Sequence, residues 1–105
     1  MRRPYSFHRD HCGHSITVNI RAGRITETEL LVDGKEVGFQ REHGLGTLPR
    51  VLAGELPNDP AGAFQVRIDR PARGSTGLAC VLVIGDDELP MADRTVPPHD
   101  NAMML

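Results

Sequence analysis

The sequence is poor in aromatic residues, with three phenylalanines, one tyrosine and no tryptophan among 105 residues. Proteins that bind single-stranded nucleic acid stack its bases on several aromatic side chains, and such a surface is hard to assemble from this composition. The chain also lacks an excess of positive charge, because its formal net charge is −2. Nucleic acid and anionic membranes attract basic surfaces, so we expect neither as a partner. Lys35 is the single lysine, and we interpret this preference for arginine as the mark of a GC-rich bacterial genome.

Long apolar runs are also absent from the sequence, and no segment approaches the roughly 20 apolar residues of a membrane-spanning helix. The first residues lead directly into an alternating segment, without the apolar core of a secretory signal. We therefore expect a cytoplasmic protein with no membrane span. The two cysteines, Cys12 and Cys80, should be reduced thiols in that compartment, and the alternative is a disulfide between them in an oxidising one. Cys80 adjoins an apolar run, so we expect it to be a small buried hydrophobic residue.

Alternation of apolar and polar residues is the main feature that the sequence does have. Ile16, Val18 and Ile20 alternate with polar residues, as a strand with one buried face requires. Glycine, proline and aspartate interrupt the chain at short intervals, and no segment shows sustained helical periodicity. The sequence therefore predicts an all-β protein, an antiparallel β-sandwich of about seven to eight short strands. We expect strands near residues 4–9, 14–21, 25–33, 36–41, 47–56, 64–69 and 78–84, and a last segment over residues 88–96 that Pro90 breaks.

The length of the chain indicates a single domain with one core. We expect this domain to span residues 1–96 and to be followed by a flexible tail of residues 97–105. Residues 14–37 and 63–89 share one order of features: an alternating segment, a turn with glycine and arginine, an apolar strand, a glycine turn and a short acidic segment. This similarity predicts an internal duplication, in which each copy supplies the apolar face against which the other packs.

The pair Asp33-Gly34 predicts a tight hairpin turn between two apolar runs. Both central positions of a type I′ turn take positive φ, which aspartate tolerates and glycine favours. In the strand after this turn, we expect Val37 and Phe39 to be buried, because apolar residues at alternate positions belong to one face.

Residues 31–37, with the sequence LVDGKEV, resemble a segment of the Fas apoptotic inhibitory molecule family. That family carries a similar strand ending in a V-D-G-K-E turn, preceded by an H-x-I strand as in residues 14–16. A later strand pair of the family resembles residues 64–69 and 81–89. The resemblance implies a compact antiparallel β-sandwich without a cofactor, which acts through protein contacts. The tryptophan and other aromatic residues of the family are missing here, so no functional residue of the family can be placed on this chain.

Four residues of metal-binding type lie close together near the first expected hairpin, namely His8, His11, Cys12 and His14. Imidazole and thiolate groups are ligands that Zn²⁺ prefers, so these residues form a candidate metal site. Their spacing matches no zinc-finger or zinc-ribbon pattern. Strand alternation also places His8 and His14 on opposite faces unless a bulge intervenes. The alternative is a polar, exposed hairpin end without a metal.

The sequence supports a non-catalytic protein-interaction or regulatory module rather than an enzyme, because it contains no coherent set of catalytic residues. The module would bind a protein partner, or a second copy of itself, through an edge strand. Two strands are candidates for that edge: residues 4–9, and the strand near Pro49, since proline is tolerated mainly in edge strands. The alternative from another class is a zinc-dependent enzyme or sensor built on the His8–His14 hairpin. A regulatory domain of a larger assembly is a third interpretation.

Overall fold

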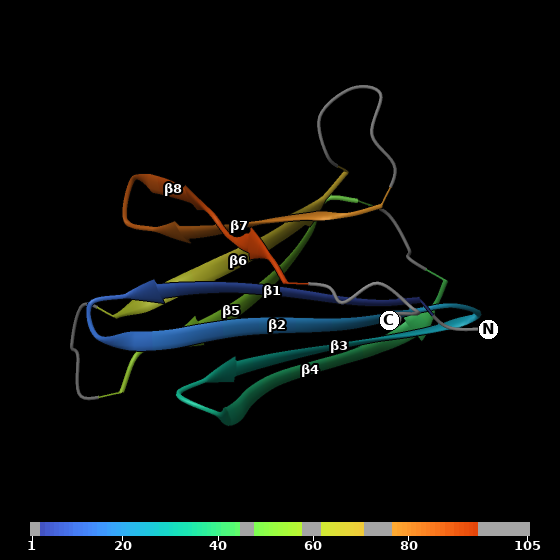
Figure 1. Ribbon diagram of the computed structural model, residues 1–105, viewed down its shortest axis with the longest axis horizontal. Coiled ribbons are helices and arrows are strands. Elements are labelled where there is room, and N and C mark those ends of the chain that lie inside the picture. Colours follow the sequence, from blue (N-terminus) through green and yellow to red (C-terminus); the bar gives the residue numbers. More distant parts are fainter. Residues whose placement is uncertain (1–2, 45–47, 58–61, 71–76, 95–105) are drawn as a thin grey trace, which may run out of the picture.

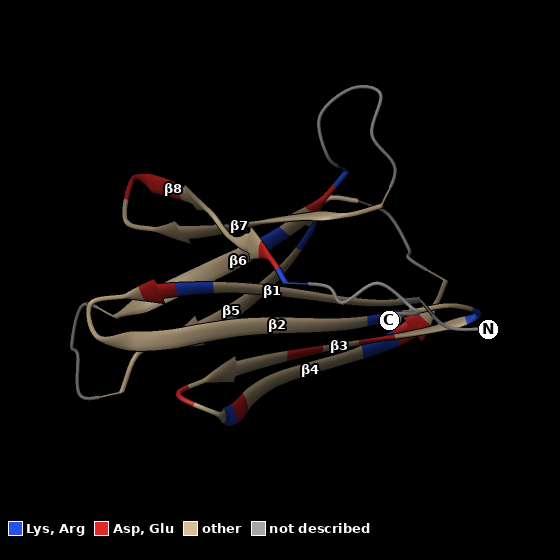
Figure 2. Cartoon of the chain, viewed as in Figure 1, with Lys and Arg blue, Asp and Glu red and all other residues tan. Residues whose placement is uncertain are grey.

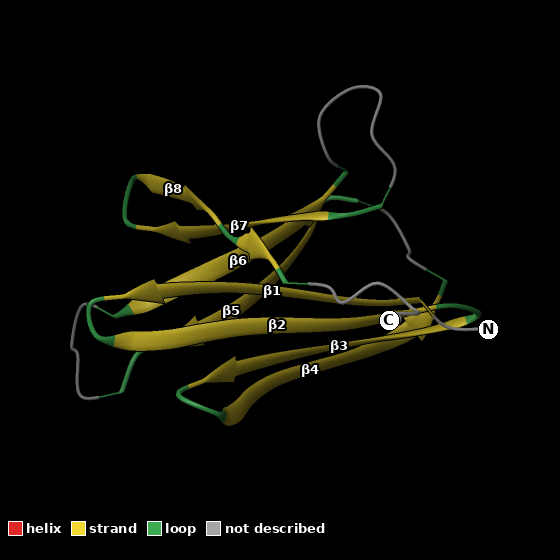
Figure 3. Ribbon diagram, viewed as in Figure 1, coloured by secondary structure: helices red, strands yellow, loops and turns green. Residues whose placement is uncertain are grey.

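The computed structural model describes residues 3–44, 48–57, 62–70 and 77–94 (Figure 1). In this part of the chain all regular structure is β-strand, and no helix occurs (Figure 3). The nine strands in these ranges are β1 (Arg3–His11), β2 (His14–Ala22), β3 (Ile25–Val32), β4 (Lys35–His43), β5 (Arg50–Glu55), β6 (Ala63–Asp69), β7 (Ala79–Ile84), β8 (Asp87–Pro90) and β9 (Ala92–Asp93).

The strands form two antiparallel sheets, which lie as two layers (Figure 1). One sheet has five strands in the order β4-β3-β2-β1-β9, and the other has four strands in the order β5-β6-β7-β8. The predicted all-β antiparallel sandwich is therefore confirmed. The chain completes most of the first sheet, enters the second at β5, and returns to the first at β9.

The return to the first sheet takes place at Met91, which is buried. Its N–H donates to the carbonyl of Cys80 in β7 (3.0 Å), and the N–H of Arg94 donates to the carbonyl of Ser6 in β1 (2.7 Å). The segment expected over residues 88–96 is broken at Pro90, as predicted, because β8 ends there and β9 follows in the other sheet. The proline that ends β8 has no N–H to continue a ladder, and the chain crosses between the sheets directly after it.

The core lies between the two sheets and is formed by the alternating positions of their strands. The predicted inward residues of β2 and β6 are all buried, so these two alternation patterns are confirmed. Aliphatic side chains dominate, and burial of each contributes roughly 1.5–3 kcal/mol. The buried hydrophobic residues are Phe7, Ile16, Val18, Ile20, Leu30, Val32, Leu52, Leu56, Phe64, Val66, Ile68, Leu78, Cys80, Leu82 and Met91.

Two tight hairpins join the first strands. Asp33 and Gly34 have φ of 52° and 83°, as predicted for a type I′ turn. Cys12 and Gly13, which connect β1 to β2, have φ of 51° and 80°, so the same turn geometry recurs there. Both turns are two residues long, and this length fixes the register of the strands on either side.

The two segments predicted to be copies of one another, residues 14–37 and 63–89, both form three-stranded antiparallel meanders. Residues 14–37 span β2, β3 and the start of β4, and residues 63–89 span β6, β7 and most of β8. Consecutive strands are hydrogen-bonded neighbours in both meanders. Their common topology is consistent with a duplication, which stays a prediction. The expected tail, residues 97–105, lies outside the described residues.

The edges of the sheets differ from the prediction at one of two places. The strand near Pro49 is indeed an edge, because β5 is the outermost strand of its sheet. The strand expected at residues 4–9 is not, because β1 lies between β2 and β9. Strand β9 pairs with Phe7 and His8. This pairing could not be foreseen because it depends on the crossing of the chain after β8.

One buried arginine connects the edge strands β4 and β5. Arg50, at the start of β5, points inward, and its guanidinium donates to Oε1 of Gln40 (2.7 Å). The same group forms an ion pair with Glu42 at 3.0 Å. Both acceptors belong to β4, so Arg50 holds the open sides of the two sheets together. A buried charge needs such partners, because removing it from water without them is costly.

Candidate functional site

His8 is the first of the predicted metal-binding residues, and both of its ring nitrogens have hydrogen-bond partners. Its Nδ1 lies 3.0 Å from Oγ1 of Thr17 and its Nε2 lies 2.8 Å from Oδ1 of Asp10. Thr17 is the residue directly opposite His8 on β2. The imidazole is therefore fixed on the outer face of the five-stranded sheet by its neighbours.

His14 is directed towards a different group, the turn between β3 and β4. Its Nδ1 lies 2.7 Å from Oδ2 of Asp33, and Oδ1 of Asp33 accepts a hydrogen bond from the N–H of Ser15 (2.9 Å). The hydrogen bond from His14, followed by that from Ser15, lowers the pKa of Asp33. His14 thus joins two neighbouring hairpins.

The structure does not bring the four predicted ligands together. His11 lies opposite His14, and both occupy positions that face the inner side of the sheet. His8 occupies a position that faces the outer side, and Cys12 is exposed in the turn. In the described ranges no group of three or more His, Cys, Asp or Glu side chains is placed to hold a metal ion. The regular pleat of β1 and β2 separates the side chains, because the register runs to the turn without a bulge.

The cysteines are both free thiols, so the alternative of a disulfide between them is wrong. Cys80 is buried in β7, as predicted. Burial, with a smaller effect of Asp93, raises the pKa of its thiol to about 12. Since the thiolate is the reactive form of cysteine, Cys80 is a packing residue.

A surface of different character covers the outer face of the five-stranded sheet. A hollow of about 440 Å³ lies there over β1 to β4, with Arg94 at the β9 side. Its floor is a polar ladder in which Oγ of Ser6 donates to Oδ1 of Asn19 (2.8 Å) and Nδ2 of Asn19 donates to Oε1 of Glu29 (3.3 Å). Phe39, opposite Glu29, is the next residue across. We call this concavity the outer hollow.

Residues of both charges lie along β2, β3 and β4 (Figure 2), and the lining of the outer hollow includes Arg21, Glu27 and Glu29. Arg41 on β4 forms an ion pair with Glu27 on β3, with Nε and Oε2 3.7 Å apart. On the other side of Phe39, a side-chain hydrogen bond between Glu36 and Glu29 raises the pKa of Glu36. The mixed charges leave Phe39 as the main apolar contact that β4 offers there.

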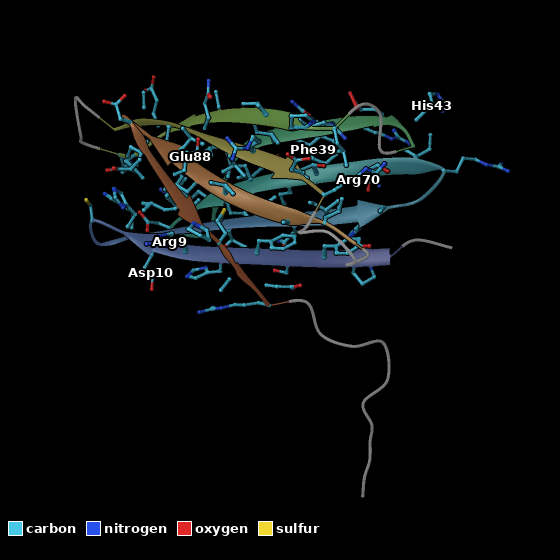
Figure 4. All side chains as sticks on the ribbon, turned by 90° about the horizontal axis from the view of Figure 1, so that it is seen from above. Arg9, Asp10, Phe39, His43, Arg70 and Glu88 are labelled. Atoms are coloured by element: carbon cyan, nitrogen blue, oxygen red, sulfur yellow. The ribbon has the colours of Figure 1, made fainter. Side chains whose placement is uncertain are left out.

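Strand β4 departs from the predicted pattern of burial. Val37 and Phe39 were expected to be buried, but 46% and 51% of their surfaces are exposed (Phe39 is labelled in Figure 4). The cause is a β-bulge, since Leu30 pairs with Gly38 while Leu31 pairs with Glu36. Val37 is the extra residue, and every residue after it changes face. Within the described part of the chain, the large hydrophobic residues with substantial exposure are Val37, Phe39 and Val51, which all belong to the edge strands β4 and β5.

A second hollow, of about 550 Å³, lies over the other sheet. Its lining includes the small residues Ala53 and Gly54 of β5 and Ala63 of β6. It offers fewer side-chain groups for recognition than the outer hollow does.

Comparisons with models of protein families, with curated protein sequences and with solved structures found no significant match. No helix among the described residues is long and apolar enough to cross a membrane. The outer hollow and β4 were missed as a site from the sequence. Alternation already placed Asn19 on the outer face, but it carried no sign of the bulge that exposes Phe39.

Proposed function

We propose that this chain is a non-catalytic protein-interaction module, which binds an extended segment of a protein along β4. The observation that carries the proposal is the exposure of Val37 and Phe39 on a nine-residue edge strand beside the outer hollow. Soluble proteins normally shield long edge strands, because unpaired N–H and C=O groups there accept any extended chain. A long edge strand that exposes large hydrophobic side chains is therefore typical of a binding surface.

The chemistry of the site fits strand addition. A bound strand would gain affinity from main-chain hydrogen bonds to β4, while alternate side chains would face the outer hollow. There Phe39 provides apolar contact, and Asn19 and Glu29 provide polar groups. The resemblance to the Fas apoptotic inhibitory molecule family implies a function in protein contacts, which agrees with this proposal. We place the protein in the cytoplasm, where two free thiols are stable.

The proposal is tested by selecting binders from a phage-displayed library of linear peptides against the wild-type protein. We expect the selected peptides to lose roughly tenfold or more in affinity for Phe39→Asp, because a central aromatic contact is removed and a charge is introduced. Gln65→Asp is the matched control, since Gln65 is exposed on β6 in the other sheet. Selected peptides that bind Phe39→Asp as tightly as wild type would contradict the proposal.

A further inference from the structure

The direction of the main-chain groups along β4 follows from its pairing with β3. Hydrogen-bonded and non-hydrogen-bonded pairs alternate in an antiparallel ladder. The N–H of Gly44 donates to the carbonyl of Arg24 (2.8 Å), and stepping by two residues from this pair places Gln40 among the residues bonded to β3. The N–H and C=O groups of Phe39 and Arg41 therefore point away from β3, towards the open edge.

We infer that the partner of β4 is a second copy of this chain. The two β4 strands would pair antiparallel about a twofold axis at Gln40, and the two five-stranded sheets would join into one. This inference rests on the proposed interaction function and names its partner. Phe39 then lies opposite the partner's Arg41, and Arg41 opposite the partner's Phe39. Each of these pairs exchanges two main-chain bonds, so about four bonds form.

The chemistry of the facing side chains selects this register. The guanidinium of Arg41 can lie over the aromatic ring of the partner's Phe39, which is a favourable cation–π contact. A register centred on Arg41 instead would set two like charges directly opposite each other, which is destabilising. A register centred on Phe39 would bring Arg41 against the partner's Val37, where the bulge interrupts the ladder.

The inward side of the strand also accommodates this pairing. Glu42 would lie opposite the partner's Gly38, which has no side chain to obstruct it. Its charge is already balanced by Arg50 at 3.0 Å, so pairing does not bring an isolated carboxylate to the interface. A twofold axis perpendicular to the sheet leaves the outer face of both copies on the same side. The two outer hollows would therefore open on one side of the joined sheet.

Sedimentation velocity over a rising concentration series tests the inference. We expect wild type to reach twice the mass of the single chain, and Arg41→Pro to remain at the single-chain mass. Proline at position 41 removes an N–H that points to the open edge, so the pairing of β4 with β3 keeps its hydrogen bonds. Circular dichroism checks that Arg41→Pro is folded, and Gln65→Asp should dimerise like wild type.

The register is tested by oxidative cross-linking of Gln40→Cys in a Cys12→Ser background. Residues opposite each other in a non-hydrogen-bonded pair have Cβ atoms close enough for a disulfide, so we expect a covalent dimer. Glu42→Cys in the same background should stay uncross-linked. A wild-type mass that never rises above one chain would overturn the inference, as would a dimer that Arg41→Pro leaves intact or the reverse cross-linking pattern. Peptide binding that still depends on Phe39 would then leave the proposed function standing without self-pairing.

Discussion

Strands β4 and β8 hold the same position in the two meanders, since each is the third strand and lies at the edge of its sheet. Their surfaces are opposite in character. Strand β8 is four residues long and ends at Pro90, and its Glu88 is bound by Arg67 at 3.0 Å. Strand β4 is nine residues long and exposes Val37 and Phe39.

Short length, proline and charge are the means by which proteins keep edge strands from pairing. Strand β8 has all three. Strand β4 has charged residues and a bulge near its start, but it is nine residues long, contains no proline and exposes Phe39. This difference is the reason that we propose β4, and not β8, as the edge that pairs with another chain. Figure 4 shows Glu88 at the same end of the sandwich as Arg9 and Asp10, while His43, which ends β4, lies at the other end.

The largest expected effect is a difference in stability between substitutions of two arginines, Arg50 beside β4 and Arg67 beside β8. Arg50→Ala should lower the free energy of unfolding by about 3 kcal/mol, because Gln40 and Glu42 lose a buried partner and the open sides of the sheets separate. Arg67→Ala should change stability little, since an exposed ion pair contributes little. Urea denaturation of both variants measures the contrast, and similar losses for the two would refute it.

Deletion of Val37 should sharpen the contrast by making β4 a longer regular edge. The pairs of Leu31 with Glu36 and of Leu30 with Gly38 already flank the bulge, so removing the extra residue leaves them in place. The open edge then gains the main-chain groups of Glu36, and self-association should become roughly tenfold tighter, which corresponds to 1.4 kcal/mol. Sedimentation equilibrium gives the dissociation constant, and weaker association would show that the bulge itself is needed for binding.

A smaller effect on stability is expected from Thr28, on the strand that pairs with β4. Thr28, opposite Gln40, is fully buried, and its hydroxyl has no hydrogen-bond partner among the described residues. Thr28→Val replaces that hydroxyl with a methyl group of similar size. We expect a gain of about 1 kcal/mol in the free energy of unfolding, because an unsatisfied buried polar group is removed. Thermal denaturation tests this, and a loss of stability would mean that the hydroxyl is satisfied in solution.

The smallest effects are opposite in sign at the two edges and depend on pH. The hydrogen bond from Arg67 lowers the pKa of Glu88, so its contribution exists above its unfolded pKa and is lost as pH falls through the folded value. The hydrogen bond to Glu29 raises the pKa of Glu36, so its contribution exists at low pH and is lost as pH rises. At neutral pH, Glu88→Gln should therefore reduce the melting temperature and Glu36→Gln should increase it. The difference for Glu36→Gln should disappear once acid protonates Glu36, and the difference for Glu88→Gln should disappear only at a lower pH, because the pKa of Glu88 is lowered and that of Glu36 is raised. Shifts of equal sign at neutral pH would contradict this account.

Features set by local sequence could be predicted, and features set by contacts between distant strands could not. The alternation of Ile16, Val18 and Ile20 and the turn at Asp33-Gly34 depend on neighbouring residues, so they identified buried strands and a hairpin correctly. The bulge that exposes Phe39 lies where the pairing of β4 with β3 changes register, beside Leu30 and Gly38. The alternation of apolar and polar residues gives no sign of this change. The same holds for β9, whose pairing with β1 requires the crossing at Met91.

The candidate site was predicted less well than the fold for a related reason. His8 and His14 are close in sequence, but their side chains have different partners, Thr17 on β2 for His8 and Asp33 in the turn after β3 for His14. The outer hollow takes its residues from four strands, β1 to β4, and from Arg94 after β9, and none of these segments carries a recognisable motif. Only the assembled sheet brings Ser6, Asn19 and Glu29 into one ladder.

Amide hydrogen exchange followed by NMR at low and high protein concentration tests most directly whether β4 is an open edge that pairs. At low concentration, the amides of Phe39 and Arg41 should exchange rapidly while those of Gln40 and Glu42, bonded to β3, are protected. At high concentration, Phe39 and Arg41 should become protected as well. Slow exchange of both at every concentration would show that the edge is already covered, and fast exchange of both at every concentration would show that it does not pair with itself.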